Sequence, residues 1–168
     1  WFVQFSVWFL RGTPILLQLY FFWIFLPRAT GIKIPDSTCI IIALIVNASS
    51  YVSEIIRAGI QAVDIGQTEA ARSLGMTARN TMTKIILPQA VKNILPALGN
   101  EFITMIKQAS LASVFFINEL TTSYKTVASA TFRQVESIII AGIIYLLVTT
   151  ILGRIMAYAE WRMKQNER

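Results

Sequence analysis

Three stretches of the chain are rich in apolar residues and contain no charged side chain. They cover residues 12–27, 37–53 and 137–153, so each is 16 or 17 residues long. With polar flanking residues, such stretches are just long enough for a helix that crosses a bilayer. A fourth stretch, from Pro96 to about Leu120, is interrupted by Glu101 and Lys107. The pattern predicts an all-α, polytopic transmembrane protein whose fourth span is the weakest, and charges inside that span are candidates for function.

Turn-forming residues mark the ends of these helices. Thr13 is suited to the N-cap and Pro14 to the first helical position, so a helix is expected from Pro14 to about Leu26. Gly31 and Pro35 interrupt the chain in a short outer loop over 27–36. The other expected elements are a span over about 37–56, a helix restarting at 95–96, an outer loop over 118–135 that can hold a short helix, and a last span over 136–158.

A polar segment over 64–88 separates two of the most hydrophobic parts of the chain. Asp64 and Gln67 have the spacing of a capping box, and Glu69 is expected in the first helical turn, where the helix dipole favours a negative charge. Gly75 is placed to adopt the left-handed conformation that ends such a helix, and Thr77 can cap a second helix, which a proline at position 88 terminates or kinks. The segment therefore predicts a helix-turn-helix.

The same segment offers a surface on which another protein could dock. Ala70 and Ala71 form a small, flat face, and Leu74, one turn later, supplies an apolar side chain. An amphipathic loop lying on lipid headgroups is the alternative interpretation. Just before the segment, Glu54 and Arg57 are three residues apart and can pair on one helical face.

Composition and charge support a membrane location and an orientation. Hydrophobic residues make up 55% of the chain and the mean hydropathy is +0.58, which is more apolar than ordinary soluble domains. If four spans alternate, ten basic residues fall on one side: Arg11, Arg57, Arg72, Arg79, Lys84, Lys92, Arg154, Arg162, Lys164 and Arg168. Four fall on the other side: Arg28, Lys33, Lys125 and Arg133. This asymmetry predicts a multi-pass protein of the cytoplasmic membrane with residues 64–88 and the C-terminus in the cytoplasm, and the net charge of +6 reflects orientation rather than nucleic-acid binding.

Several kinds of chemistry have no support in the sequence. The chain lacks a P-loop motif, so it is not expected to cradle nucleotide phosphates by itself. Histidine is absent and Cys39 is the single cysteine, which excludes disulfides within the chain and the usual zinc sites. No nucleophile has an adjacent base. We therefore expect no catalytic residue, no metal site and no cofactor bound by this chain.

Residues 69–88 match a motif at every position. The motif consists of Glu69-Ala70-Ala71, three residues, Gly75, nine residues, Ile85, one residue and Leu-Pro. It resembles the EAA pattern of the permease subunits of bacterial ATP-binding-cassette importers. In that family this loop is the cytoplasmic coupling element that rests on the ATPase. The sequence RGTP at 11–14, followed by an apolar run with Gln18, resembles the polar amino acid branch.

The resemblance extends from Arg11 to the C-terminus, with two departures. Family members often have two glycines after the arginine at position 57, but here Ala58 stands at the first of them, before Gly59. The run IKQASLASV at 106–114 resembles a lysine-containing run of these permeases, with Gln108 and Ala109 where acidic or Thr residues are expected.

The resemblance implies a fold, partners and a function. The fold is that of a type I importer permease, in one domain over 1–168 that includes the coupling loop over 64–88. The partners are ATPase subunits that use ATP and Mg²⁺, a second permease subunit, and an extracellular solute-binding protein that delivers an amino acid. ATPase closure would move the coupling helices and reopen the spans to the outside. Because the chain begins at Trp1 with an apolar stretch, at least one further segment is expected upstream.

Lys107 is the candidate contact for the substrate carboxylate. An ammonium group near the bilayer interior costs about 2.5 to 3.5 kcal/mol, so it should face protein or water and find an anion. Helical spacing places Ser110 and Ser113 along the same face, and Asn47 and Ser50 of the second span are further pathway candidates. In the structural alternative, Lys107 reaches outward or pairs with an acid at position 101 or 119, and the serines only pack helices.

Two other classes of function remain open at this point. A channel or an ion-coupled secondary transporter could use Glu54, Glu101 and Lys107 as a relay, and it would need no ATPase. A membrane scaffold would move no amino acid and would need no polar cavity. Co-purification with an ATPase that depends on this chain separates these readings from an importer permease.

Overall fold

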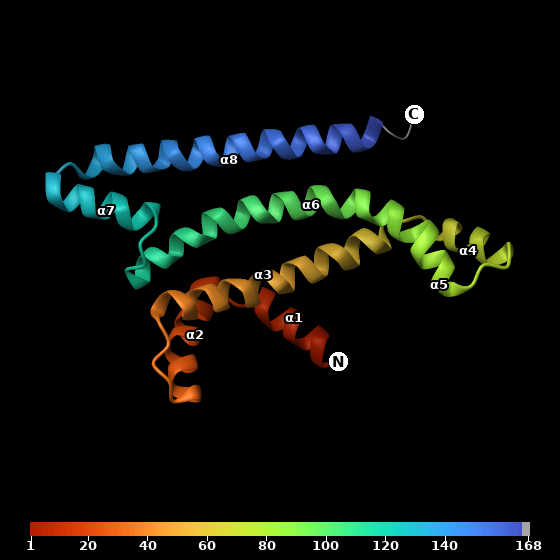
Figure 1. The fold of residues 1–168 in the computed structure, drawn as a ribbon, viewed down its shortest axis with the longest axis horizontal. Coiled ribbons are helices and arrows are strands. Elements are labelled where there is room, and N and C mark those ends of the chain that lie inside the picture. Colours follow the sequence, from red (N-terminus) through yellow and green to blue (C-terminus); the bar gives the residue numbers. More distant parts are fainter. Residues whose placement is uncertain (166–168) are drawn as a thin grey trace. The chain divides into compact units, whose positions relative to one another are not determined.

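The computed structural model describes residues 1–165, and all regular secondary structure in that range is helical. This confirms the predicted all-α class. The predicted basic tail is described only in part, because Arg168 and the side chain of Lys164 lie outside the described residues. Contacts group the chain into two compact units, one of residues 1–50 and 103–152 and the other of residues 51–102 and 153–165. Figure 1 shows the helices of the chain in sequence colours, from α1 in red to α8 in blue.

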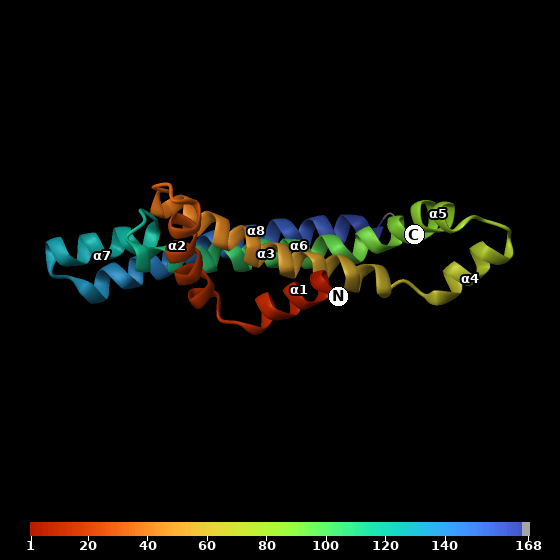
Figure 2. The same cartoon turned by 90° about the horizontal axis from the view of Figure 1, so that it is seen from below.

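The first unit contains a bent helix pair and a small apolar core. Its elements are α1 (Phe2–Gly12), α2 (Ile15–Thr30), the start of α3 (Asp36–Gln61), the end of α6 (Leu87–Gln108), the 3₁₀ helix η2 (Ala109–Phe115), α7 (Leu120–Thr131) and the first part of α8 (Gln134–Gln165). The helices α1 and α2 are bent by 112° relative to each other. Figure 2 shows them running in different directions. The buried core of this unit consists of Leu19, Ile40, Ala43, Ala112 and Phe115.

Two described helices are long and apolar enough to cross a membrane, α3 and residues 134–163 of α8. The bent pair of α1 and α2 makes a third crossing if it counts as one span. The predicted fourth span from Pro96 to about Leu120 is not one α-helix, because α6 ends at Gln108 and gives way to the tighter η2. The charges at Glu101 and Lys107 correctly marked this region as the weakest span, but both predicted ends of the span were wrong.

The start and end of α2 differ from the sequence prediction. Pro14, rather than Thr13, is the N-cap residue, with an extended backbone (φ −61°, ψ 133°). The Thr13 hydroxyl instead donates a 3.0 Å hydrogen bond to the carbonyl of Phe9 in α1. At the other end α2 continues through Pro27 to Thr30 and stops at Gly31, which is left-handed (φ 67°). Pro27 deprives the helix of only one hydrogen bond, so the chain completes another turn before the glycine ends it.

Neither Pro88 nor Pro96 breaks the helix that contains it. The predicted second coupling helix is α5 (Ala78–Thr81), which passes through a π-helical turn, η1 (Met82–Ile86), directly into α6. Pro88 is the second residue of α6 and directly follows this π turn, so α6 continues through the proline. Pro96 lies inside α6, so the predicted restart at 95–96 was wrong.

In the second unit, α3 and α6 approach closely at a glycine. A Cβ atom added to Gly59 would lie 2.3 Å from Cγ1 of Ile94, so there is no room for a side chain between the two helices. Gly99 of α6 is in close contact with Met156 of α8 in a similar way. Small residues at such contacts allow helix backbones to pack closely within a membrane.

Candidate functional site

The first coupling helix, α4 (Ile65–Ser73), begins at the predicted residue. Asp64 is its N-cap, and the Asp64 carboxylate accepts a 2.8 Å hydrogen bond from the backbone N–H of Gly66. The reciprocal bond of a capping box is not formed, because the side-chain oxygen of Gln67 accepts from Gln89 instead, at 3.4 Å. Glu69 is the fifth residue of α4 and lies beyond the first turn. The predicted dipole interaction of Glu69 was therefore wrong, since that effect falls off within the first turn.

The turn after α4 has the predicted left-handed glycine. Gly75 has φ 82°, and its N–H bonds the carbonyl of Arg72, while the N–H of Met76 bonds the carbonyl of Ala71. These two bonds make a complete Schellman motif. Leu74, at the helix end, leaves 84% of its surface exposed. The turn thus holds an apolar side chain in a fixed position toward the outside.

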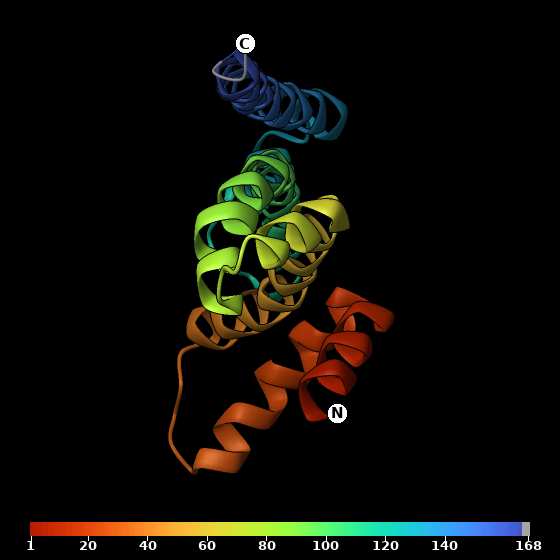
Figure 3. The ribbon, with the colours of Figure 1, turned by 90° about the vertical axis from the view of Figure 1, so that its right-hand side faces the viewer.

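The two alanines of the segment do not share one face. Ala70 is exposed, but Ala71 is buried where α4 packs against α5 and η1. Glu69, Leu74 and Gly75 are exposed as well. Figure 3 shows α4 in yellow and α5 in yellow-green in the foreground. The surface available to a partner therefore consists of Ala70, Leu74 and the glycine turn, and Ala71 fixes the segment internally.

Thr77 caps the second coupling helix as predicted. Its hydroxyl accepts a 3.3 Å hydrogen bond from the N–H of Asn80. Arg72 adds a further link across the turn, because its guanidinium donates to the carbonyl of Met76 at 2.9 Å. The helix-turn-helix is therefore stabilised by the N-cap, the Schellman motif, the second cap and one side-chain bond.

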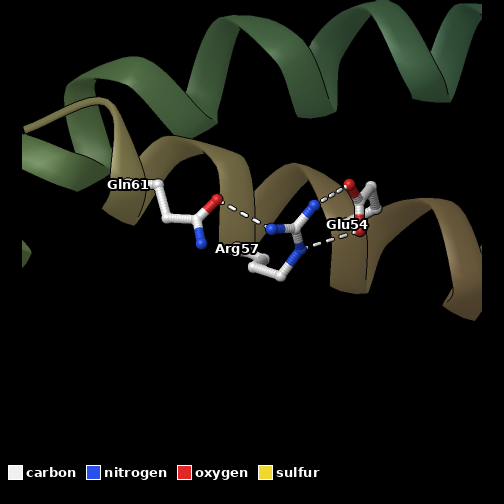
Figure 4. Close-up of polar contacts among 3 residues, drawn as sticks. All are labelled: Glu54, Arg57 and Gln61. Atoms are coloured by element: carbon white, nitrogen blue, oxygen red, sulfur yellow. Dashed lines mark hydrogen bonds and ion pairs between the residues drawn. The ribbon is translucent and has the colours of Figure 1, made fainter. Parts of the chain in front are cut away.

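A charged pair near the end of α3 leads into this segment (Figure 4). Arg57 and Glu54 form the predicted ion pair, with the Arg57 Nε atom 3.0 Å from one carboxylate oxygen and a second guanidinium nitrogen on the other. Gln61, one turn further on, accepts a 2.7 Å bond from Arg57. The pair was predicted from its i,i+3 spacing, whereas the contact with Gln61 was not, although the i,i+4 spacing of Gln61 from Arg57 could have indicated it.

Two pathway candidates, Asn47 and Ser50, are buried in a polar network of the first unit. The Asn47 side-chain amide donates a 3.0 Å hydrogen bond to Gln18, and the Ser50 hydroxyl donates to the carbonyl of Asn47 at 2.6 Å. Gln18 in turn donates to the carbonyl of Leu10 at 2.7 Å and to the hydroxyl of Thr13 at 2.8 Å. The network therefore joins the break between α1 and α2 to α3, and these hydrogen-bonding groups are occupied by the protein itself.

The other candidates separate into two groups. Ser110 donates a 2.6 Å bond to the backbone carbonyl of Lys107, whose side chain is exposed and has no polar partner among the described residues. Ser113 is buried and lies 3.3 Å from the ammonium nitrogen of Lys125, not beside Lys107. The predicted common face failed because the α-helix ends at Gln108, and its spacing no longer applies in η2.

Glu119 is not a partner of Lys107. Its carboxylate caps α7 by accepting bonds from the N–H groups of Thr121 and Thr122, both at 2.7 Å. The Tyr145 hydroxyl of α8 donates to the same carboxylate at 3.1 Å. The pairing of Lys107 with Glu119 that the sequence left open is therefore not formed. Among the described residues, no group of His, Cys, Asp and Glu could hold a metal ion.

Comparisons with known proteins agree along the chain. The family model described as "Binding-protein-dependent transport system inner membrane component" matches residues 1–165. The arginine transport system permease protein ArtQ of Bacillus subtilis is 40% identical over 167 residues, which cover 99% of this chain and 76% of that protein. The nopaline transport system permease protein NocM of Agrobacterium fabrum is 39% identical over 171 residues, covering 96% and 71%.

Solved structures show the same fold. A crystal structure of an amino acid ABC transporter with histidines matches with a TM-score of 0.90 and 46% identity, covering 95% of this chain and 74% of that one. An inward-facing structure of the MetNI methionine ABC transporter matches with a TM-score of 0.68 and 19% identity, covering 90% and 71%. The second match is a likeness of fold.

Proposed function

The chain belongs to the family of inner membrane components of binding-protein-dependent transport systems, and we propose that it forms the path for polar amino acids in an ATP-driven importer. Its fold is the type I importer permease fold that the sequence predicts, and it is a transport component rather than an enzyme. The amino acid class is supported by the names of the relatives, which include arginine and glutamine transport systems. The observation that carries the ATP-driven part of the proposal is the hydrogen-bonded turn at Gly75, which exposes Leu74.

Permeases of this family work with ATPase subunits, and we place the contact with them at residues 64–88. The ATPases would bind ATP and Mg²⁺, since this chain has no phosphate-binding loop. A second permease subunit and an extracellular solute-binding protein complete the proposed assembly. The excess of basic residues on one side supports a cytoplasmic position for the coupling segment and the C-terminus.

The second unit can transmit a movement of the coupling segment. The segment follows the end of α3, where Arg57 connects Glu54 to Gln61, and it continues without interruption into α6. The two caps and the Schellman motif hold α4 and α5 as one body, so a push on Leu74 would displace that body rather than deform it. Closure of the ATPases would then shift α3 and α6, so that the path opens in turn to the two sides of the membrane.

Lys107 remains the proposed partner of the substrate carboxylate. Its ammonium group is exposed and is not held by another described residue, so it is available to an anion. Ser110 would assist from the adjacent turn. Asn47, Ser50 and Ser113 would contact the substrate only by exchanging hydrogen bonds that they now make with Gln18, the Asn47 carbonyl and Lys125.

Gly75→Val tests the coupling surface against a matched control. Gly75 and Gly31 both have positive φ, and a Cβ atom at either would meet no atom within 4 Å, so valine imposes a similar backbone strain at both sites. We expect Gly75→Val to lower the recovery of ATPase with the permease and to reduce ATP-dependent amino acid uptake. Gly31→Val should leave ATPase recovery unchanged. Equal recovery with both variants would remove the coupling role of this turn, and uptake without any ATPase would favour a channel or an ion-coupled transporter.

A further inference from the structure

An aromatic pocket in the first unit has no role in the function proposed above. It has a volume of about 680 Å³, which is within the range of pockets that hold small ligands. Tyr20 and Trp23 of α2, Asp36 at the start of α3, and Phe115 and Phe116 of the η2 region are among its lining residues. We call these five residues the aromatic pocket.

Three of its rings form a contiguous cluster. The ring centre of Phe115 lies 4.9 Å from that of Tyr20 and 5.5 Å from that of Trp23, and the Tyr20 and Trp23 centres are 6.4 Å apart. Phe115 is buried and belongs to the apolar core with Leu19, so the cluster rests on a packed base. Tyr20 and Trp23 remain partly exposed. Their π-electron systems are therefore held in place and remain accessible from the cavity side.

Asp36 brings a negative charge to this cluster. The indole N–H of Trp23 donates a 2.8 Å hydrogen bond to one Asp36 oxygen, which fixes the carboxylate beside the ring. The second oxygen makes no hydrogen bond to any described residue. Among the described residues that line the pocket, Asp36 alone is charged. A carboxylate with a free oxygen next to aromatic rings complements a cation in two ways, through charge-assisted hydrogen bonds and through cation–π attraction.

The backbone at the rim also departs from its relaxed form. Phe116 has φ 56° and is 90% exposed. Glycine and asparagine are the usual residues in this conformation, and a bulky side chain there is a genuine outlier. Phe116 is the left-handed C-cap of η2, and it places an additional aromatic residue at the edge of the same cavity.

We propose that the aromatic pocket binds the cationic side chain, an ammonium or guanidinium group, of an amino acid substrate. The inference rests on the proposed function and adds the substrate's charge class to it. An anionic side chain would face Asp36, and a wholly apolar ligand would cover the carboxylate without pairing it, which is unfavourable. A cation can donate a hydrogen bond to the free Asp36 oxygen and at the same time make cation–π contacts with the rings.

The experiment compares arginine and glutamine uptake by the complete transporter in proteoliposomes. Asp36→Asn removes the charge while keeping an oxygen for the Trp23 indole. We expect it to raise the KM for arginine about fivefold to tenfold, with kcat and glutamine uptake unchanged. Glu136→Gln is the matched control, because Glu136 is also a first-turn acid of a long helix and does not line the pocket. It should change neither KM.

Substitutions at Trp23 separate the ring from its hydrogen bond. Trp23→Phe keeps an aromatic face and loses the N–H that holds Asp36, so arginine KM should rise less than in Trp23→Leu, which loses both. Asp36→Glu should retain most of the arginine affinity. If Asp36→Asn fails to assemble, the Trp23 variants and Asp36→Glu still test whether the pocket binds a cation.

The possible outcomes distinguish this inference from the function on which it rests. Equal loss of arginine and glutamine uptake in Asp36→Asn would indicate a structural role or a contact with a basic residue of the binding protein, and it would overturn the cation site. Unchanged KM values, or a wild-type transporter that takes up glutamine and not arginine, would overturn the site and leave the importer function standing. A wild-type assembly that takes up neither amino acid would overturn both.

Discussion

Replacing Gly59 by alanine would test whether α3 and α6 must touch closely in the unit that holds the coupling segment. The added Cβ atom would lie 2.3 Å from Cγ1 and 3.2 Å from Cδ1 of Ile94. The shorter distance is more than 1 Å below the ~3.5 Å at which carbon atoms make contact. Ile94 is buried, and a β-branched residue in a helix has one strongly preferred χ1 rotamer, so it cannot easily turn away. The two helices would have to separate.

The expected cost follows from two opposing effects. Overpacking of a close contact costs about 1–3 kcal/mol. Alanine has a higher helix propensity than glycine, and this difference stabilises the folded state by up to about 1 kcal/mol. A net destabilisation of up to about 2 kcal/mol is therefore expected. Gly153→Ala is the matched control, because Gly153 is also helical, belongs to the same unit, and has no atom within 4 Å of a built Cβ. That variant should be as stable as the wild type or slightly more stable.

The assay is the midpoint of thermal unfolding of the assembled transporter in detergent, measured for both variants. A second substitution, at Ile94, tests whether the clash with this residue causes the loss of stability. Ile94→Ala removes Cγ1 and costs about 2–5 kcal/mol alone, but combined with Gly59→Ala it should restore part of the lost contact. The double variant should then be more stable than the sum of the single changes. Equal midpoints for Gly59→Ala and Gly153→Ala, or strictly additive effects in the double variant, would refute the close-packing argument.

Three further predictions concern the polar network, the topology and the substrate path. Gln18→Leu should reduce the free energy of unfolding by about 2 kcal/mol or more, and so lower the unfolding midpoint, because it leaves the Leu10 carbonyl and the Asn47 amide without their partner; a midpoint equal to that of the wild type would show that the network is dispensable. A cysteine at Thr77 should be labelled only from the cytoplasm and one at Ser123 only from outside, and labelling of both from one face of intact cells would contradict the orientation. Lys107→Met should abolish uptake while assembly and ATPase stimulation by the loaded binding protein persist, and normal uptake would exclude Lys107 from the path.

Features that depend on neighbouring residues could be predicted from the sequence. The caps at Asp64 and Thr77, the left-handed Gly75 and the pair of Glu54 with Arg57 were all correct, because each involves groups within four residues of one another. The EAA motif also identified the family. Hydrophobic stretches likewise indicated the membrane class, since a bilayer requires long apolar helices with internally satisfied backbones.

Local signals were less reliable where backbone geometry can adjust. Pro27, Pro88 and Pro96 each indicated a helix boundary, yet all three lie within helices or directly after a π turn. One missing N–H can be tolerated when the rest of the helix is well bonded and packed. The change from α6 to η2 could not be predicted from the sequence either, because no proline or glycine marks it. The expected alignment of Lys107 with Ser113 therefore failed.

Tertiary structure alone decided which polar residues meet. Gln18 contacts Asn47, 29 positions away, Trp23 contacts Asp36, and Ser113 contacts Lys125 rather than Lys107. The sequence determined that these side chains are polar and lie on or near apolar helices. It could not determine their partners, because a hydrogen bond between helices depends on the angle and rotation at which the helices pack. In an apolar environment an unpaired polar group is costly, and the fold decides which groups are close enough to pair.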